Sequence, residues 1–292
     1  MFDLTLAASA RKTTIISRKR EIFGLVTRLL RLEAGRSWGA RNRPRPRDAA
    51  SNGSGPSARL DTPLKDAETE MNDAIPPTTR PRTESHAGCY ASVGVHPHDA
   101  KDCTENIVES LRNLAANPGV CAWGETGLDF NRMYSPQIDQ EKWFVRQLEI
   151  GQQLDLPFIF HERDSNGRFF EILGAHFRPD SKGVIHCFSG SQQELEQYLD
   201  FGLYIGITGI LTIKKRGAAL RELATCIPSE RILVETDAPY LTPAPEKNRI
   251  RRNEPAFVRS VLLKLAEIRG ENPEDLAEIV WANTCRLYGI NA

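Results

Sequence analysis

Five polar side chains stand where short apolar runs of the chain end: His96, Glu125, His161, His186 and Asp237. Imidazole and carboxylate groups from separate segments are the ligands with which proteins hold a divalent metal ion that activates water. A carboxylate at the end of a buried strand is costly to desolvate unless a positive charge compensates it, and no Lys or Arg stands beside Glu125. We therefore interpret Glu125 as facing a metal ion that His161 and His186 share.

Each of these signals also has an ordinary structural interpretation. A single histidine at a strand end is more often hydrogen-bonded within the fold than bound to a metal. Glu125 could cap a helix, and Asp237, which precedes an Ala-Pro pair, could start a turn. The combination favours a metal site. The ligand types do not identify the metal, because Mg²⁺ and Mn²⁺ prefer oxygen ligands, Zn²⁺ accepts nitrogen ligands, and this set contains both.

Apolar runs and amphipathic segments alternate from Cys89 onward. The expected strands are Ala91–Val95, Val120–Trp123, Phe158–Phe160, Gly183–Ile185, Leu203–Ile207 and Ile232–Val234. The expected helices are Thr104–Ala116, Gln137–Leu154, Ser165–His176, Ser191–Asp200, Ala218–Cys226, Glu254–Arg269 and Pro273–Leu287. Buried strands that alternate with crossover helices predict an α/β fold, with a parallel sheet and the helices outside it. Six such units predict a (β/α) barrel or most of one, whose active site lies at the carboxyl ends of the strands.

The 292 residues divide into two parts of different composition. Residues 1–50 contain 12 Lys and Arg against 4 Asp and Glu. Residues 36–85 consist largely of Arg, Pro, Gly, Ser and Thr, a composition that cannot bury a core. We therefore predict a basic, low-complexity, largely disordered extension over residues 1–88, with at most a strand at Met1–Leu6 and a helix at Glu21–Leu32. Residues 89–292 are predicted to form the metal-dependent hydrolase domain.

The overall composition is typical of a soluble globular protein, with 40% hydrophobic residues and a net charge of zero. No apolar run approaches the roughly 18 residues of a membrane span, so we expect no membrane partner. The six cysteines are scattered and the N-terminus lacks the apolar core of a secretory signal, which indicates a reducing compartment. We expect a cytoplasmic protein, with a mitochondrial or nuclear location as the alternative because the first 35 residues are basic.

Six motifs, in unbroken order over roughly residues 89–290, resemble those of the TatD family of metal-dependent nucleases. They are Gly94-Val95-His96-Pro97-His98, Gly124-Glu125-Thr126-Gly127-Leu128-Asp129-Phe130, Phe160-His161-Glu162-Arg163-Asp164, His186-Cys187-Phe188-Ser189-Gly190, Glu235-Thr236-Asp237-Ala238-Pro239-Tyr240-Leu241 and Arg252-Asn253-Glu254-Pro255. The chain looks nearest to the bacterial TatD branch.

The resemblance implies a TIM-barrel-type metallohydrolase that acts as a 3′-5′ exonuclease on single-stranded DNA or RNA. It implies a divalent metal ion as cofactor, in the first place Mg²⁺, with Mn²⁺ or Zn²⁺ as alternatives. By the same resemblance the metal ligands are Glu125, His161, His186 and Asp237. Asp237 is in addition the group that orients or deprotonates the attacking water, and His96 is a histidine that takes part in catalysis.

Two arginines are candidates for holding substrate phosphates. Arg163 stands two residues after His161, and Arg252 belongs to a basic cluster that follows the last expected strand. Both should lie on loops around the ligand face, where a cation attracts the phosphates of a chain end. Ordinary solvated loop charge is the alternative for both, and the acidic balance of the chain after residue 50 argues against a surface that coats nucleic acid broadly.

The start of the chain departs from the family pattern. Many relatives have a His-x-His pair on their first strand, and this chain has none in residues 1–85. The two strands that precede the first motif in the family are not recognisable. We therefore expect an incomplete barrel of six clear strands, whose uncovered edge strands favour lower stability or self-association. Two other functions remain open: a related amidohydrolase-type metal hydrolase acting on amides or lactones, and an inactive truncated family member.

Overall fold

The computed structural model describes residues 15–16 and 89–290, with the strand at 15–16 described by its backbone alone. The predicted strand Met1–Leu6, the predicted helix Glu21–Leu32 and the predicted disorder of residues 36–85 lie outside these residues. The division of the chain at residue 88 therefore stays a prediction. None of the helices in the described part of the chain is long and apolar enough to cross a membrane.

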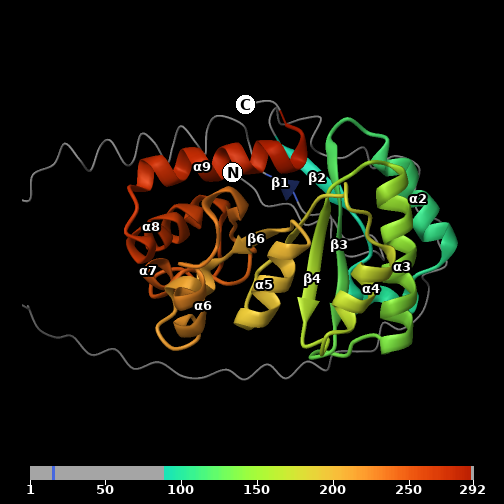
Figure 1. The fold of residues 1–292 in the computed structure, drawn as a ribbon, viewed down its shortest axis with the longest axis horizontal. Helices are drawn as coiled ribbons and strands as arrows, with labels where there is room; N and C mark the ends of the chain where they lie inside the picture. The colour runs from blue at the N-terminus through green and yellow to red at the C-terminus, as the bar shows by residue number, and fades with distance from the viewer. Residues whose placement is uncertain (1–14, 17–88, 291–292) are drawn as a thin grey trace, which may run out of the picture.

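The described strands form one seven-stranded sheet, in which every strand neighbours the next one in the sequence (Figure 1). The first, β1 (Ile15–Ile16), pairs antiparallel with β2, and all later pairs are parallel. The others are β2 (Tyr90–Val93), β3 (Val120–Asp129), β4 (Phe158–Arg163), β5 (Gly183–Ile185), β6 (Tyr204–Ile207) and β7 (Ile232–Val234). The six predicted parallel strands are therefore confirmed, whereas β1 was not expected.

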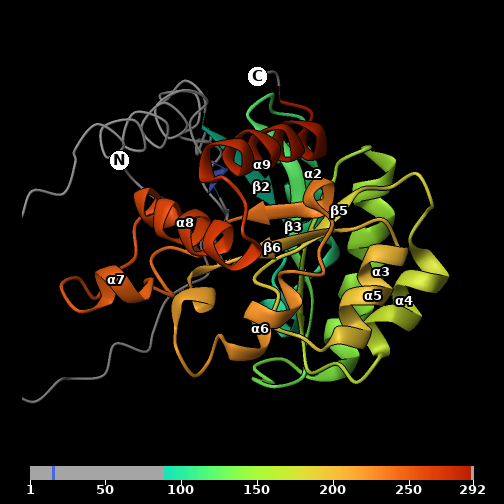
Figure 2. The ribbon, with the colours of Figure 1, turned by 60° about the vertical axis from the view of Figure 1, so that its left-hand side comes forward.

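Among the described residues, five α-helices connect the parallel strands and lie outside the curled sheet, and three more follow β7 (Figures 1 and 2). They are α2 (Glu105–Ala115), α3 (Gln137–Gln153), α4 (Arg168–His176), α5 (Gln192–Asp200), α6 (Ala218–Leu223), α7 (Ala244–Lys247), α8 (Val258–Arg269) and α9 (Pro273–Tyr288). Short 3₁₀ turns are η2 (Pro97–Asp102), η3 (Gly209–Thr212), η4 (Ser229–Arg231) and η5 (Pro255–Phe257). Helices α2 and α3 pack on β2 and β3, and α8 and α9 pack on β7.

Local sequence signals explain where several of these helices begin and end. The Thr104 side chain accepts a hydrogen bond from the Ile107 amide at the start of α2. Ser191 and Glu194 form a reciprocal capping box at the start of α5, which satisfies two amides that the first helical turn leaves unpaired. Left-handed glycines, Gly270 and Gly289, end α8 and α9.

Buried apolar side chains cover both faces of the sheet. The larger cluster lies between the sheet and the helices and is rich in aromatic rings, among them Trp123, Phe144, Phe158, Phe160 and Phe169. The smaller cluster occupies the inner face, with Ala122, Ile159, Val184, Tyr204 and Leu233 from the strands and Leu287 from α9. Because successive strand residues point to opposite faces, this alternation identifies the inner face as the interior of a barrel.

The described residues form an incomplete barrel. Among them, β7 pairs with β6 and does not close onto β2 or β1. The predicted incompleteness of the TIM-barrel-type fold is therefore confirmed for this part of the chain. The open edge of β7 is covered in part by α9, where the Asn283 amide donates hydrogen bonds to the carbonyls of Ser229 and Ile232, at 2.8 and 2.9 Å.

Candidate metal centre

The carboxyl ends of β3 and β4 and the segment after β2 bring two carboxylates and three histidines together. His161 Nδ1 lies 2.8 Å from Glu125 Oε1, and His161 Nε2 lies 3.1 Å from Asp129 Oδ2. His98 Nε2 approaches the same Asp129 oxygen at 2.7 Å. His96 Nε2 lies 3.4 Å from Glu125 Oε1. Both carboxylates are thus bracketed by imidazoles.

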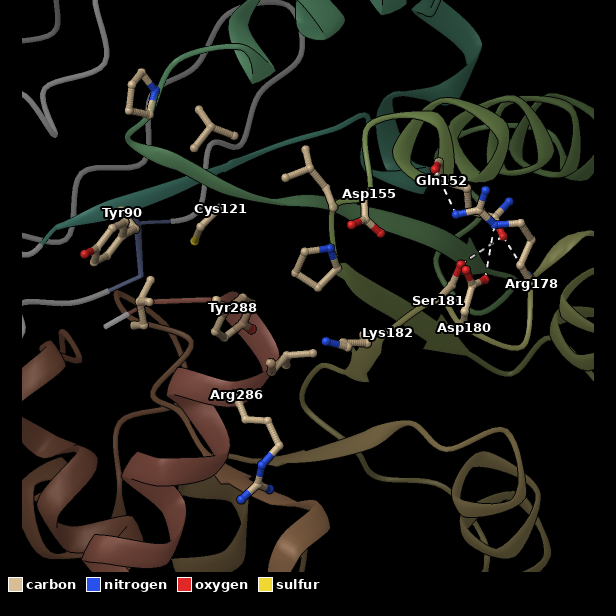
Figure 3. Close-up of a pocket in the computed structure, with 17 residues that line it drawn as sticks. Tyr90, Cys121, Gln152, Asp155, Arg178, Asp180, Ser181, Lys182, Arg286 and Tyr288 are labelled. Atoms are coloured by element: carbon tan, nitrogen blue, oxygen red, sulfur yellow. Dashed lines mark hydrogen bonds and ion pairs between the residues drawn. The ribbon is translucent and has the colours of Figure 1, made fainter. Parts of the chain in front are cut away.

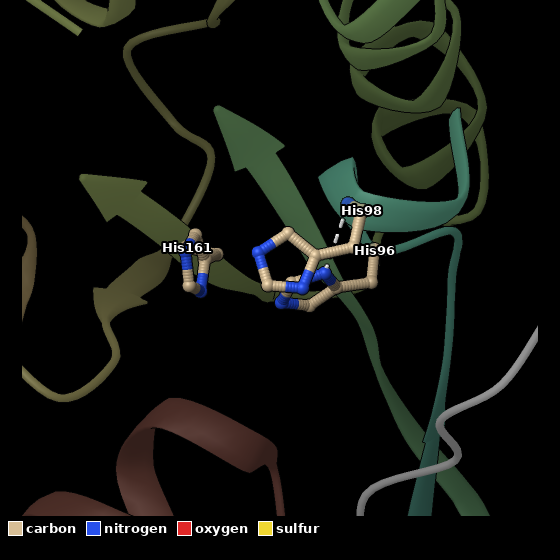
Figure 4. Close-up of side chains that lie close together, drawn as sticks. All are labelled: His96, His98 and His161. Atoms are coloured by element: carbon tan, nitrogen blue, oxygen red, sulfur yellow. Dashed lines mark hydrogen bonds between the residues drawn. The ribbon is translucent and has the colours of Figure 1, made fainter. Parts of the chain in front are cut away.

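The three imidazoles lie close enough together to share one cation. The ring centroids of His96 and His98 are 4.2 Å apart, and those of His96 and His161 are 4.5 Å apart. One nitrogen from each ring lies within 4.8 Å of the others (Figure 4). His96 and His98 come from the turn into η2, whereas His161 comes from β4, so the group depends on the pairing of β2, β3 and β4.

A second group of site residues gathers at the ends of β5 and β7. Glu235 Oε2 lies 2.8 Å from His186 Nδ1, and the other Glu235 oxygen accepts a hydrogen bond from the Cys187 amide. His186 Nε2 faces Asp237 Oδ1 at 3.5 Å. The imidazole of His186 is therefore held by a carboxylate on each side.

The charges of the two groups act on one another. Burial raises the pKa of Glu125, but the positive charges of His96 and His186, together with the hydrogen bond from His161, outweigh burial and hold that pKa well below its usual range. Burial lowers the pKa of His186, but the charges of Glu235 and Glu125 outweigh it and raise that pKa well above its usual range. Glu125 of the first group and His186 of the second are therefore coupled by charge.

The backbone at the site makes room for these contacts. Gly127 has a φ of +143°, and a side chain there would collide with the carbonyl of His161. Only glycine adopts that conformation easily, and its small size lets β3 and β4 approach. Cys187 and Asp237 have φ values of +51° and +56°, a region that costs non-glycine residues energy and is found at functional sites.

The predicted site residues fall into two classes in the structure. His96, Glu125, His161, His186 and Asp237 all lie in the two groups described above. Arg163 is half-buried at the end of β4, and Arg252 is exposed in the segment after α7. Within the described residues, no ion pair joins either guanidinium to the acidic site residues. Neither arginine is therefore needed to balance the buried carboxylates.

Three further side chains belong to the site although the sequence analysis gave them no role: His98, Asp129 and Glu235. Their spacing carried a signal. Asp129 is four residues after Glu125 on β3, and Glu235 and His98 each stand two residues from a predicted site residue. Sequence proximity was the available signal, because His98 lies in the 3₁₀ turn η2 and β3 has a register shift at Glu125, so regular strand alternation does not place these side chains.

A cavity of about 470 Å³ lies elsewhere in the molecule (Figure 3). Residues at the amino ends of the strands line it, including Tyr90, Val120 and Lys182, and Tyr288 closes it from α9. Its charged lining is mixed, and none of the predicted site residues belongs to it. The cavity and the candidate metal centre are therefore at opposite ends of the strands.

The family model and the relatives with similar sequences indicate the same family. The model of the family described as TatD related DNase matches residues 72–289. The 3′-5′ ssDNA/RNA exonuclease TatD of Citrobacter rodentium is 45% identical over 204 residues, which are 69% of this chain and 78% of that protein. The protein of the same name from Escherichia coli is 42% identical over 207 residues, 70% of this chain and 80% of that protein.

Solved structures agree with this result. YJJV, a TatD homolog from Escherichia coli, superposes with a TM-score of 0.65 and 29% identity over 72% of this chain and 80% of that chain. A TatD family hydrolase from Entamoeba histolytica superposes with a TM-score of 0.62 and 27% identity over 68% of this chain and 74% of that chain.

Proposed function

The chain belongs to the TatD related DNase family, and on that premise we propose that it removes nucleotides from the 3′ end of single-stranded DNA or RNA. It is a hydrolase acting on ester bonds, and the alternative amide or lactone chemistry is not favoured. One observation carries the proposal beyond the family: two carboxylate and histidine groups lie at the carboxyl ends of β3, β4, β5 and β7, within the described residues, and Glu125 and His186 couple them by charge.

The residues present fit a divalent metal ion. Glu125, His161, His186 and Asp237 are the proposed ligands, because each group pairs one imidazole with one carboxylate at the carboxyl ends of the strands. The histidines carry raised pKa values beside the buried carboxylates, so a cation could replace their protons as the positive charge of the site. When bound, such an ion supplies Lewis acidity and makes water a stronger nucleophile. Mg²⁺ is the proposed ion, with Mn²⁺ and Zn²⁺ as alternatives.

The other side chains then have separate proposed roles. Asp237 accepts a hydrogen bond from the attacking water and takes its proton as oxygen adds to phosphorus and the bond to the leaving alcohol breaks. His96, buried beside Glu125, takes part through that carboxylate: its Nδ1 accepts a hydrogen bond from the His98 amide, so its N–H is on Nε2 and faces Glu125. Asp129 fixes the ring orientations of His98 and His161 through one oxygen.

Arg163 and Arg252 are proposed to hold substrate phosphates. Neither guanidinium is engaged by the acidic site residues in the described part of the chain, so both are available to an anion that enters the open ends of the strands. Phosphate contacts position the strand and carry no base specificity. We further propose a cytoplasmic location, consistent with scattered free cysteines.

The test is a nuclease assay on a 5′-labelled single-stranded oligonucleotide with Mg²⁺, Mn²⁺ or Zn²⁺ after thorough metal removal. We expect a ladder that shortens from the 3′ end, no reaction in EDTA, and slower reaction on duplex DNA. Residual activity that survives EDTA would contradict the metal proposal. A complete lack of hydrolysis with all three ions, by protein that unfolds cooperatively, would favour an inactive truncated family member.

A further inference from the structure

Exposed apolar side chains are concentrated near the catalytic end of the strands. Within the described residues, the exposed large hydrophobic side chains are Leu114, Met133, Tyr134, Ile138, Tyr240 and Ile250. All but Leu114 lie in the segments that follow β3 and β7. Exposed apolar area gathered at one place marks a binding surface more often than scattered apolar residues do. The segments that follow β3 and β7 are therefore candidates to contact a ligand with apolar faces.

Tyr134 is the member of this set that touches the site. Its side chain is 55% exposed, and its ring centroid lies 4.8 Å from that of His98 at an interplanar angle of 84°. His98 in turn holds Asp129 at 2.7 Å, and Asp129 contacts His161. A ring that is half open to solvent thus packs edge-on against a histidine of the candidate metal centre.

The loop that presents Tyr134 is fixed on both sides. The next residue, Ser135, is fully buried, and its hydroxyl donates to the His98 carbonyl at 2.8 Å and accepts from the Lys101 amide at 3.0 Å. The buried amide of Gln140 donates to the carbonyls of Ser135 and Asp129 and accepts from the Asp129 amide. The backbone around Tyr134 is therefore tied to the same strand end that carries the site.

We propose that Tyr134 is a stacking platform for a nucleobase of the single-stranded substrate, at one of the three nucleotides nearest the 3′ end; this inference rests on the proposed function. Every base has a π-face, so stacking on an aromatic ring holds a strand without reading its sequence. A base in a duplex is already stacked between its neighbours and paired, so the platform favours single strands. Holding the ring in place before binding reduces the ordering that binding requires.

The experiment measures the coupling between this ring and a base. Oligonucleotides that carry an abasic site at the first, second or third position from the 3′ end are compared with the intact strand. For wild type, Tyr134→Ala and Tyr134→Phe, kcat/KM is measured with Mg²⁺. Leu114→Ala is the matched control, because it removes an exposed apolar side chain on α2. Thermal unfolding of each variant verifies that the fold is kept.

We expect one abasic position to slow the wild type by about fivefold to a hundredfold, the range of one base-aromatic stack. At that position Tyr134→Ala should lose most of the preference for the intact strand over the abasic strand, whereas Tyr134→Phe and Leu114→Ala should keep this preference. The ratio of kcat/KM on the intact strand to kcat/KM on the abasic strand is the quantity compared. If this ratio is equal for wild type and Tyr134→Ala at all three positions, with intact strands still degraded, the platform is overturned and the proposed function stands. No hydrolysis of intact strands by the wild type would overturn both.

Discussion

Glu235 fixes His186 across the gap between β7 and β5, with Oε2 2.8 Å from Nδ1, while its other oxygen accepts the amide hydrogen of Cys187. A carboxylate that binds Nδ1 of a histidine orients the ring and leaves Nε2 for a metal or a substrate. In this molecule Nε2 of His186 faces Asp237. Glu235 therefore orients one proposed ligand, His186, although it is not itself a proposed ligand.

We predict that Glu235→Gln weakens metal binding by about 10-fold to 100-fold, the usual effect of losing a partner that orients a ligand. The variant should remain folded, since the Gln side chain has nearly the same size. Isothermal titration with Mn²⁺ and a thermal melt give the two readouts. Glu230→Gln, an exposed substitution in η4, is the control. Unchanged metal affinity in Glu235→Gln would show that the contact is only structural.

Gly206 on β6 makes room for the same carboxylate, because a side chain at this position would collide with Glu235. We predict that Gly206→Ala reproduces the loss of metal affinity seen in Glu235→Gln, and that the double variant loses little more, since both changes disturb one contact. Gly174→Ala in α4 is the control, because nothing lies within 4 Å of the added carbon. Additive losses in titrations of the double variant would contradict this explanation.

Metal binding should be visible as stability. A ligand that binds only the folded chain stabilises it by about 2.7 kcal/mol at 100 times its Kd, so Mn²⁺ should raise the melting temperature and EDTA should reverse the rise. We predict that His161→Ala and His186→Ala each abolish most of this rise. Differential scanning fluorimetry measures it. His176→Ala, at the end of α4, should keep the full rise; an equal loss there would point to nonspecific binding.

The sequence predicted much of this fold because its signals are local. The strands Gly183–Ile185 and Ile232–Val234 have the predicted bounds, and the helices predicted to start at Thr104 and Ser191 are confirmed, with these two residues as their N-caps. β3 was predicted to end at Trp123 but continues to Asp129. Glycine inside a strand often marks a bulge or an end, but here pairing with β4 continues past a register shift between Gly124 and Thr126, because the neighbouring strand determines where the pairing stops.

The candidate site was predictable in its residue types and less so in its contacts. Strand-end position alone identified Glu125 and His186, because the carboxyl ends of parallel strands meet. The partners Asp129 and Glu235 were missed, because which oxygen meets which imidazole depends on strand register. Tyr134 was missed for a different reason, since exposure of a loop side chain depends on how the loop is tied down.

Phosphate contacts should give a salt-dependent signature. We predict that Arg252→Ala weakens binding of single-stranded oligonucleotides at every sequence and reduces the slope of log affinity against log salt by about 0.7, the value for one phosphate contact. Fluorescence anisotropy across a salt series in Ca²⁺ or EDTA measures this without cleavage. Arg112→Ala on α2 is the control, because it removes a partly exposed cation that is far from Arg252 in the sequence. A slope equal to that of the wild type would show that Arg252 makes no phosphate contact and is an ordinary solvent-exposed charge of the loop.

The open edge of β7 is the side on which the described part of the barrel does not close. The Glu235 amide donates to the Ile207 carbonyl on β6. Backbone groups of successive strand residues point to opposite sides, so Ile232, an odd number of residues away, directs its amide and carbonyl toward the open edge. Asn283, which is 1% exposed, donates to the carbonyls of Ile232 and Ser229 from α9. Asn283→Ala would leave both carbonyls without this donor.

We predict that Asn283→Ala lowers the free energy of unfolding by about 1–3 kcal/mol, the cost of a buried polar group left unsatisfied, as measured by urea denaturation. An edge that has lost its cover also pairs more readily with another chain, so light scattering after size exclusion should show more self-association. Asn106→Ala, exposed on α2, should change neither quantity. If Asn283→Ala matches the wild type in both, α9 does not protect this edge, and the sheet tolerates its open side by other means.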